Sequence, residues 1–377
     1  MSVGMPHRTN SRVIRQGPAA RRAPLGPRVR RGVARVAEAL ATPLVPADYL
    51  DIIDPLRSGA TLRGRIVAIN PETRDAVTVV IRPGRGWAGH VPGQYIRIGI
   101  DVEGVRQWRA YSVTSPAERT DTITITVKAI PDGVVSTHLV RRARPGTVLQ
   151  LDQATGEFHL PEQLPERLLF VTAGSGVTPV MGMLRSLGTA APDIVVVHSA
   201  PTRDDVIFGG ELRALHRAGR IRLVERHTDT EGLLDVAELD AIVPDWRERE
   251  AWGCGPTGML DALEAHWDGH GIAGQLHTER FRPSVLVTGE GGTVTFARAG
   301  ITVEADGATP ILAAGEAAGV LMPSGCRMGI CRGCVVPLNE GAVRDLRNGV
   351  LTQAAPGDGV TIQTCISAAA GPCDIQL

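Results

Sequence analysis

The chain has 377 residues, of which 43% are hydrophobic and 21% charged, and its 40 basic side chains cancel its 40 acidic ones. This length predicts two or three domains, and the balanced charge gives no reason to expect a nucleic-acid partner. No run approaches the roughly 18 apolar residues of a membrane span, and no signal-peptide pattern is visible. We therefore expect a soluble cytoplasmic protein whose six cysteines are thiols rather than disulfides.

The first 35 residues contain nine arginines and no acidic residue. Such a composition cannot bury enough apolar surface to fold by itself. We expect residues 1–60 to form a basic disordered leader followed by a short connecting segment. A basic arm that docks on the anionic inner face of a membrane is the alternative.

From residue 61 onward, short runs rich in Val, Ile, Thr and Tyr alternate with turn residues. The runs cover residues 62–69, 76–83, 93–100, 109–115 and 122–130. This spacing predicts an antiparallel β-barrel or sandwich over residues 61–164.

The rhythm changes at residue 165, where apolar strands begin to alternate with helical segments. The expected strands are 167–173, 193–200, 221–228, 250–255 and 275–281, and the expected helices are 178–187, 203–219, 233–242 and 257–267. Alternation of this kind predicts an α/β domain with a doubly wound parallel sheet over residues 165–282.

A third unit follows a linker at residues 283–290. It spans residues 291–377 and begins with two alternating strands around a tight turn, at 292–306. A helix at 309–319 comes next, followed by a loop rich in cysteine and glycine. We expect a small α+β domain.

Three cysteines in this loop have the spacing C-x4-C-x2-C, and a fourth lies further along the chain. They are Cys326, Cys331, Cys334 and Cys365. This is the spacing of plant-type [2Fe-2S] ligands, and glycines among them let the loop wrap closely around a cluster. A zinc site is the alternative, but zinc prefers paired C-x2-C knuckles and only one is present. Such a cluster moves one electron at a time and needs a donor.

Residues 109–112 have the sequence RAYS at the end of a β run. With PGQYIRI at 92–98, GVVSTHL at 133–139 and ATGEFHLP at 154–161, this motif resembles the barrel of the ferredoxin-NADP reductase superfamily. The resemblance implies a flavin-binding β-barrel, with Arg109 on a flavin phosphate, Tyr111 against the isoalloxazine ring and Ser112 near its N5. We expect FAD, with FMN as the alternative.

The segment that begins at Gly133 opens a helix, where free amides and the Ser136 hydroxyl can meet the extra phosphate of FAD. The candidate flavin-binding residues are Arg109, Ala110, Tyr111, Ser112, Gly133, Val135, Ser136, Thr137 and Phe281.

The second domain resembles the nucleotide-binding half of the same superfamily. VTAGSGVTP at 171–179 follows a strand and precedes a helix, the context in which a glycine loop receives a pyridine nucleotide. By the resemblance, Cys254 lies where hydride passes from nicotinamide to flavin, Glu279 lies near the nicotinamide, and Phe281 lies near the flavin edge. The catalytic candidates are Ser112, Cys254 and Glu279. The other nucleotide-binding candidates are Gly174, Gly176, Thr178, Pro179, Gly255 and Pro256. Read without the resemblance, Cys254 is a buried core thiol and HTERF at 277–281 is a packed strand end.

The coenzyme is decided by the groups that face the ribose 2′ position, where basic and hydroxyl groups favour a phosphate and a carboxylate favours a hydroxyl. Ser199, Arg203 and Arg226 favour NADPH. Asp204 and Asp205 leave NADH open as the alternative.

The resemblance covers residues 56–377, and the third domain then corresponds to a β-grasp [2Fe-2S] ferredoxin. This domain order resembles the reductase components of oxygenases and the actinobacterial NADPH oxidoreductases that serve membrane-bound fatty acyl-CoA desaturases. It implies an oxidoreductase that passes electrons from NADPH through FAD and the cluster to an acyl-CoA desaturase or another diiron or oxygenase acceptor. We expect a cytoplasmic monomer, with peripheral association at the inner face of the membrane as the alternative. An NADH-dependent reductase of an aromatic-ring or alkane oxygenase is the alternative, and a redox sensor is a third. Arg327, Met328 and Arg332 flank the cysteines and are candidates for acceptor contact.

Overall fold

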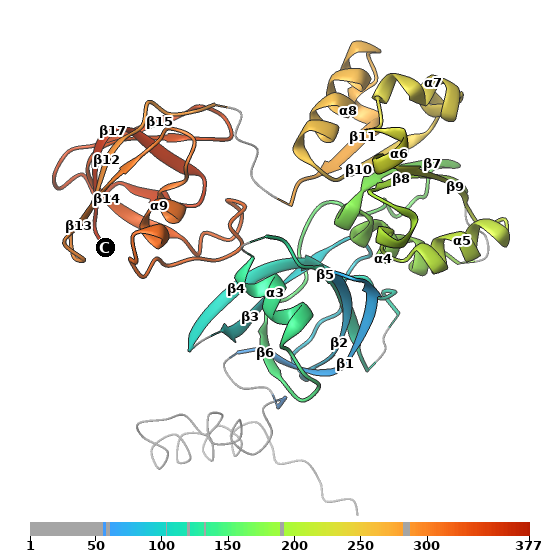
Figure 1. Ribbon diagram of the computed structural model, residues 1–377, viewed down its shortest axis with the longest axis horizontal. Coiled ribbons are helices and arrows are strands. Elements are labelled where there is room, and N and C mark those ends of the chain that lie inside the picture. The colour runs from blue at the N-terminus through green and yellow to red at the C-terminus, as the bar shows by residue number, and fades with distance from the viewer. Residues whose placement is uncertain are drawn as a thin grey trace, which may run out of the picture.

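The computed structural model resolves three lobes joined in chain order (Figure 1). The described residues are 56–57, 61–102, 104–118, 121–131, 133–188, 192–281 and 287–377. The expected basic leader and part of the expected linker lie outside them. No helix in the described part of the chain is long and apolar enough to cross a membrane.

The first lobe, called the barrel below, is an antiparallel sheet with strand order β4-β3-β6-β1-β2-β5. Its strands are β1 (Arg63–Thr73), β2 (Ala76–Pro83), β3 (Tyr95–Val102), β4 (Val105–Ser112), β5 (Ile123–Lys128) and β6 (Val148–Leu151). Helix α3 (Val134–Arg141) packs onto the core of Ile, Val and Leu side chains through Val135 and Leu139. The predicted antiparallel barrel is confirmed. The sequence pattern missed β6, whose four residues are too few to show an alternation.

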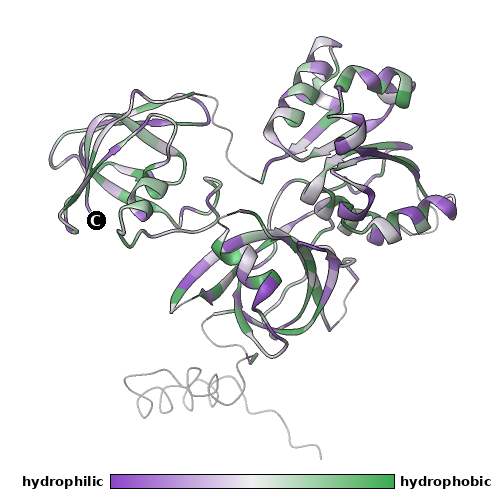
Figure 2. Ribbon diagram, viewed as in Figure 1, coloured by the Kyte–Doolittle hydropathy of each residue, from purple (hydrophilic) through white to green (hydrophobic). Residues whose placement is uncertain are grey.

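The second lobe, the parallel-sheet domain, has strand order β11-β10-β7-β8-β9. Every neighbouring pair is parallel. The strands are β7 (Arg167–Ala173), β8 (Asp193–Ala200), β9 (Arg222–His227), β10 (Glu250–Cys254) and β11 (Leu276–Glu279). The helices are α4 (Val177–Ser186), α5 (Gly209–Arg217), α6 (Thr228–Glu231), α7 (Leu239–Ile242) and α8 (Thr257–Gly269). The predicted doubly wound sheet is confirmed, and its hydrophobic strands lie between the helices (Figure 2).

Two helices of this domain are shorter than predicted. The helix expected from residue 203 begins only at Gly209, because Phe208 is buried with a left-handed backbone (φ 59°), which an α-helix cannot continue through. The helix expected at 233–242 is divided into α7 and a 3₁₀ turn before it. The Asp235 carboxylate caps this turn by accepting from the Ala237 amide.

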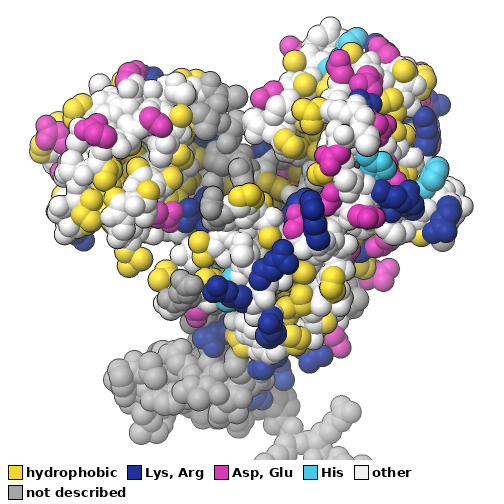
Figure 3. Space-filling model, in the orientation of Figure 1, with side chains coloured by type: hydrophobic (Ala, Val, Ile, Leu, Met, Phe, Trp, Pro, Cys, Tyr) yellow, Lys and Arg dark blue, Asp and Glu magenta, His cyan; other side chains and the backbone are white. Residues whose placement is uncertain are grey.

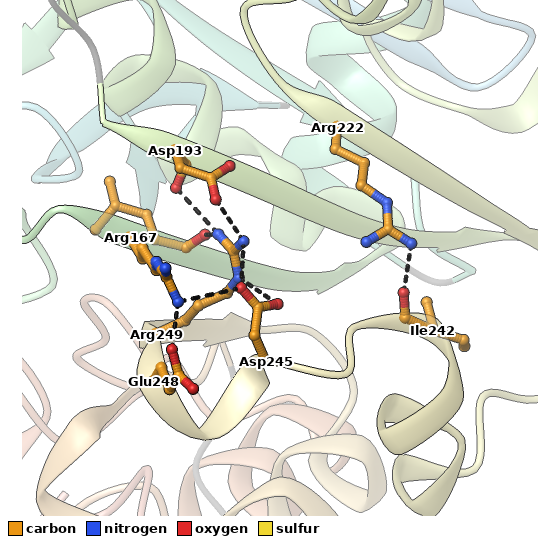
Figure 4. Close-up of polar contacts among 8 residues, drawn as sticks. Arg167, Asp193, Arg222, Ile242, Asp245, Glu248 and Arg249 are labelled. Carbon is orange, nitrogen blue, oxygen red and sulfur yellow. Dashed lines mark hydrogen bonds and ion pairs between the residues drawn. The ribbon is translucent and has the colours of Figure 1, made fainter.

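A buried arginine holds the amino ends of these parallel strands together (Figure 4). Arg249 is 4% exposed. It donates to Asp193 Oδ2 at 2.6 Å, to Asp245 Oδ2 at 2.8 Å and to the Leu168 carbonyl at 3.3 Å. A buried guanidinium with two carboxylates is stable where every donor finds an acceptor. This network is structural and lies at the opposite end of the sheet from the glycine loop.

The third lobe, the C-terminal domain, has the sheet β13-β12-β17-β14-β15, with β16 paired to β14. Its strands are β12 (Gly292–Phe296), β13 (Ile301–Ala305), β14 (Val335–Asp345), β15 (Leu351–Ala354), β16 (Thr361–Gln363) and β17 (Ser367–Ile375). Helix α9 (Ile311–Ala317) packs across a mixed sheet in which β12 and β17 are parallel. The predicted α+β domain is confirmed. Residues 324–334, called the cluster loop below, connect α9 to β14.

Candidate functional site

The RAYS motif ends β4, where it is paired with β3. Arg109 is half-buried, and its Nη1 donates to the Trp108 carbonyl at 2.7 Å. Burial, together with the neighbouring Arg327 guanidinium, lowers the pKa of Arg109 to about 10. Among the described residues no carboxylate forms an ion pair with it. A desolvated guanidinium without a counter-anion fits a phosphate group.

The last two residues of the motif, Tyr111 and Ser112, lie where the barrel meets the parallel-sheet domain. The ring of Tyr111 packs against the barrel core, and burial raises the pKa of its hydroxyl. Ser112 is 3% exposed, and its Oγ lies 3.3 Å from Thr178 Oγ1 at the start of α4. The flavin motif and the nucleotide-loop motif are therefore in direct contact.

The candidate phosphate site at α3 is more open. Gly133 precedes the helix, and no side chain caps the helix terminus. A Cβ at Gly133 would lie 2.4 Å from Ser136 Oγ, so the glycine allows this serine to fold back toward the terminus. Thr137 is exposed, whereas Val135 is 1% exposed inside the barrel core. Val135 can contribute only its backbone to a ligand.

The glycine loop after β7 packs directly on the end of β10. A Cβ at Gly176 would lie 2.0 Å from the Cys254 carbonyl oxygen, so only glycine fits there. Gly174 has a left-handed backbone with φ of 53°. Gly255 approaches the backbone nitrogen of Ala173 in the same way. The two glycine-containing motifs, separated by about 80 residues, form one surface at the carboxyl edge of the sheet, where such sheets bind nucleotides.

Cys254 and Glu279 are register partners on β10 and β11. Cys254 is fully buried, and burial followed by the charge of Glu279 raises its pKa. Burial also raises the pKa of Glu279 to about 8, and its buried Oε2 has no hydrogen-bond partner among the described residues. Phe281 packs on the adjacent core. An unpartnered carboxyl oxygen beside a shielded thiol fits a site completed by a polar ring such as nicotinamide.

The candidate 2′-phosphate residues differ in availability. Ser199 and Arg226 are register partners at the ends of β8 and β9, and Ser199 Oγ is buried without a hydrogen-bond partner among the described residues. Arg226, however, binds both oxygens of Glu238, at 2.7 and 3.1 Å, and the Glu231 carbonyl at 2.8 Å. Arg203 is exposed on a 3₁₀ turn and forms no ion pair in the described part of the chain. Arg203 is therefore the available cation, and Arg226 positions the loop after β9.

The cluster loop directs backbone amides at cysteine sulfurs. Cys331 Sγ accepts from the amides of Cys326 and Gly333 at 3.1 and 3.3 Å, and Cys326 Sγ accepts from the Met328 amide at 3.3 Å. Amide donors of this kind stabilise thiolates and the sulfurs of an iron–sulfur cluster. Arg327 and Arg332 have left-handed backbones, φ 62° and 55°, strain that is typical of functional loops.

The four cysteine side chains form two pairs. Cys326 lies beside Cys331, and Cys334 lies beside Cys365. Hydrogen bonding between the second pair lowers the pKa of Cys334 and raises that of Cys365. Across the described residues, no three His, Cys, Asp or Glu side chains converge as ligands of one metal ion. Two pairs of thiols fit two bridged irons better than one zinc ion.

A barrel for a flavin, a parallel sheet with a nucleotide loop and a loop of paired thiols define a flavin- and iron–sulfur-dependent NAD(P)H oxidoreductase. Residues 83–160 match the oxidoreductase FAD-binding domain family, and residues 294–370 match the 2Fe-2S iron-sulfur cluster binding domain family. A Mycobacterium tuberculosis protein named NADPH oxidoreductase is 48% identical, over 91% of each chain. The chain belongs to this family of oxidoreductases, which combine an FAD-binding domain with a [2Fe-2S] domain.

More distant relatives also match most of the chain. The glycine betaine monooxygenase reductase subunit of Pseudomonas aeruginosa is 29% identical and covers 73% of this chain and 84% of its own length. The solved structure of phthalate dioxygenase reductase superposes with a TM-score of 0.59 at 21% identity, covering 84% of this chain and 98% of its own. The latter similarity shows a common three-domain fold.

The sequence reasoning assigned no role to Tyr95 and Arg97, although both lie in the quoted motif PGQYIRI. Tyr95 is 7% exposed, and burial, followed by the nearby Cys326 and Glu279, raises the pKa of its hydroxyl. Arg97 lies beside Gly325 and Cys331 of the cluster loop. In the sequence, an aromatic and a basic residue in a β run do not indicate a functional site. These two residues acquire the cysteines as neighbours only when the C-terminal domain packs against the barrel.

Proposed function

We propose that the protein takes electrons from NADPH and delivers them, through FAD and the [2Fe-2S] cluster, to an external diiron enzyme, a membrane-bound fatty acyl-CoA desaturase. The single observation that carries the electron path is that one hairpin of the barrel meets both other sites: Ser112 of β4 contacts Thr178 beside the nucleotide loop, and Arg97 of β3 lies beside Gly325 of the cluster loop. Bound FAD would supply the chemistry that converts a two-electron hydride donor into a source of single electrons.

The chain's own residues would bind and orient the reactants. Arg109 and the α3 terminus would hold the flavin phosphates, and Thr178 with the glycine loop would hold the nucleotide. Buried Cys254 and Glu279 would keep water away from the face on which hydride moves, and Glu279 with its raised pKa can hold a proton at neutral pH. The two cysteine pairs would each bind one iron.

We propose NADPH as the preferred coenzyme because Arg203, just after β8, is exposed and forms no ion pair among the described residues. The buried Ser199 hydroxyl near the end of the same strand has no hydrogen-bond partner among them. The test compares kcat/KM for NADPH and NADH in the wild type and in Arg203→Ala. We expect the variant to lose about tenfold of its NADPH preference, about 1.4 kcal/mol. Arg217→Ala, an exposed arginine on α5, should leave the ratio unchanged. Equal efficiency with both coenzymes in the wild type would refute the assignment.

The desaturase as acceptor rests on the family resemblance of residues 56–377. A mixture of the protein, NADPH, an acyl-CoA desaturase and stearoyl-CoA should give oleoyl product. If no product forms while cytochrome c is reduced rapidly, the desaturase is excluded as the acceptor, and the assignment of the protein as an NADPH-dependent reductase still holds. Slow cytochrome c reduction would instead favour a redox sensor.

The second candidate is the reductase component of an oxygenase. It is favoured by the similarity to a glycine betaine monooxygenase reductase subunit. Reduction of a terminal oxygenase by this protein, with no desaturase reduction under the same conditions, would select it.

The acceptor would meet the exposed part of the cluster loop. Ile330 is 55% exposed, and Arg332 is exposed between two cysteine ligands. Arg327 donates to Glu316 of α9, with 2.7 Å between Nη1 and Oε2. Its guanidinium is therefore already paired inside the C-terminal domain. On the face drawn in Figure 3 this lobe carries many hydrophobic side chains and few basic ones. Arg332→Glu should slow acceptor reduction about tenfold and leave flavin reduction by NADPH unchanged.

A further inference from the structure

One side chain of the barrel touches the cluster loop. Arg97 lies on β3 opposite Ala110 of the flavin motif, so both project from the same face of the hairpin. Its guanidinium lies beside Gly325 and the thiol of Cys331. Gly325 lies against the same group, and a Cβ added there would be 3.6 Å from Arg97 Nη1 and 2.3 Å from Cys331 Sγ. The glycine lets the barrel and the loop come this close.

The environment of Arg97 keeps its charge effective. It forms an ion pair with Asp152, just after β6, and lies 5.7 Å from the ring centroid of Trp108. The side chains of Arg97 and Asp152 are 27% and 34% exposed. In partly buried surroundings a unit charge acts more strongly on its neighbours than in bulk water. The pair Cys326 and Cys331 therefore lies beside the positive charge of Arg97. The carboxylate that balances this charge, Asp152, belongs to the barrel.

We propose that Arg97 is a positioning residue for internal electron transfer. Its contact with Cys331 holds the cluster loop against the flavin-binding hairpin, and its charge favours the added negative charge of the reduced cluster. Each transfer moves one electron from the flavin to the cluster, and no bond to the cluster forms or breaks. The inference deepens the proposed electron path and rests on it.

The ion pair with Asp152 gives two substitutions with opposite expected effects. Arg97→Gln removes the positive charge and should make cluster reduction about tenfold less favourable, a fall of about 59 mV in its one-electron midpoint potential. Asp152→Asn leaves the Arg97 charge uncompensated and should raise the potential. Arg97→Lys keeps the charge but loses the planar fork, so it should keep the potential and slow the transfer.

The experiment uses the full chain loaded with FAD and cluster. A redox titration followed by electron paramagnetic resonance gives the potential of the cluster, and stopped-flow absorbance separates flavin reduction by NADPH from cluster reduction. We expect flavin reduction to be unchanged and cluster reduction to be about tenfold slower in Arg97→Gln. Arg106→Gln is the matched control, because Arg106 pairs with Asp101 on the same hairpin, away from the loop.

The proposal is overturned if Arg97→Gln, with normal cluster content, keeps the wild-type potential and transfer rate, or if Arg106→Gln gives the same shifts. If Arg97→Gln does not retain its cluster, the test is the midpoint potential of the cluster in Asp152→Asn. An unchanged or lower potential in that variant overturns the proposal. Failure of the proposed function would be seen separately, as a wild-type cluster that NADPH does not reduce.

Discussion

The cluster loop and the flavin–nicotinamide junction are built in different ways. The loop holds three of the four candidate cluster ligands within nine residues, 326–334. The sulfurs of this loop accept hydrogen bonds from amides of the same segment. The junction joins Ser112, Thr178, Cys254 and Glu279, which come from two domains. A local site depends on loop conformation, whereas an assembled site depends on the docking of whole domains. Substitutions in the loop should therefore affect cluster binding alone, whereas substitutions in the junction should affect the docking of the two domains.

The largest effect is expected in the cluster loop. Cys331→Ser should abolish cluster binding, because a hydroxyl is a far poorer iron ligand than a thiolate. The variant should lose the visible absorbance of the cluster and should no longer reduce the acceptor. It should still reduce ferricyanide with NADPH. Cys373→Ala, at a buried cysteine of β17 outside the loop, should keep the cluster. If it does not, the loop is less autonomous than its internal bonds indicate.

The next effect concerns the flavin. Arg109→Ala removes a half-buried cation that has no carboxylate partner in the described part of the chain, and should weaken FAD binding roughly 10- to 100-fold, as expected for charge-assisted hydrogen bonds. Equilibrium dialysis measures the affinity, and the cluster should remain. Arg106→Ala serves as the control. Unchanged FAD affinity would remove Arg109 from the flavin site.

Docking of the two glycine motifs can be broken with a single methyl group. Gly176→Ala would place its Cβ 2.0 Å from the Cys254 carbonyl, and overpacking against backbone costs about 1–3 kcal/mol. We expect lower stability to denaturant and a higher KM for NADPH. Gly258→Ala on α8 meets nothing within 4 Å and should be neutral or stabilising by about 0.5–1 kcal/mol. Equal effects of the two substitutions would contradict the close packing.

The smallest effect is a pH dependence at Glu279. Its pKa is raised from 4.5 to about 8 by burial, so the folded chain keeps a proton that the unfolded chain releases. The free energy of unfolding should then fall as pH rises from about 5 to 8. Denaturation of the cofactor-free chain should show this slope in the wild type and not in Glu279→Gln. Glu162→Gln, at an exposed loop residue, should keep the wild-type slope, and a flat wild-type profile would argue against the buried carboxyl.

The residues that the sequence could assign are those whose signal is local. The cysteine spacing, the strands that alternate in the barrel and the glycine loop between β7 and α4 all follow from neighbouring residues. The starts of α5 and α7 were missed because a left-handed Phe208 and a capping Asp235 interrupt the helical pattern. The strands β14 to β17 were not located, because their alternation is broken by Gly, Pro and register shifts.

The sequence by itself determined the three-domain order, the FAD-binding and [2Fe-2S] domains and the oxidoreductase class, because each depends on short segments with fixed spacing. Only the tertiary structure decided which charges are available. In the folded chain Arg203 is exposed, whereas Arg226 is paired with Glu238. Folding also places Arg97 beside Cys331, more than 200 residues away in sequence. Such pairings depend on which surfaces meet after folding, and residue type and spacing carry no record of that.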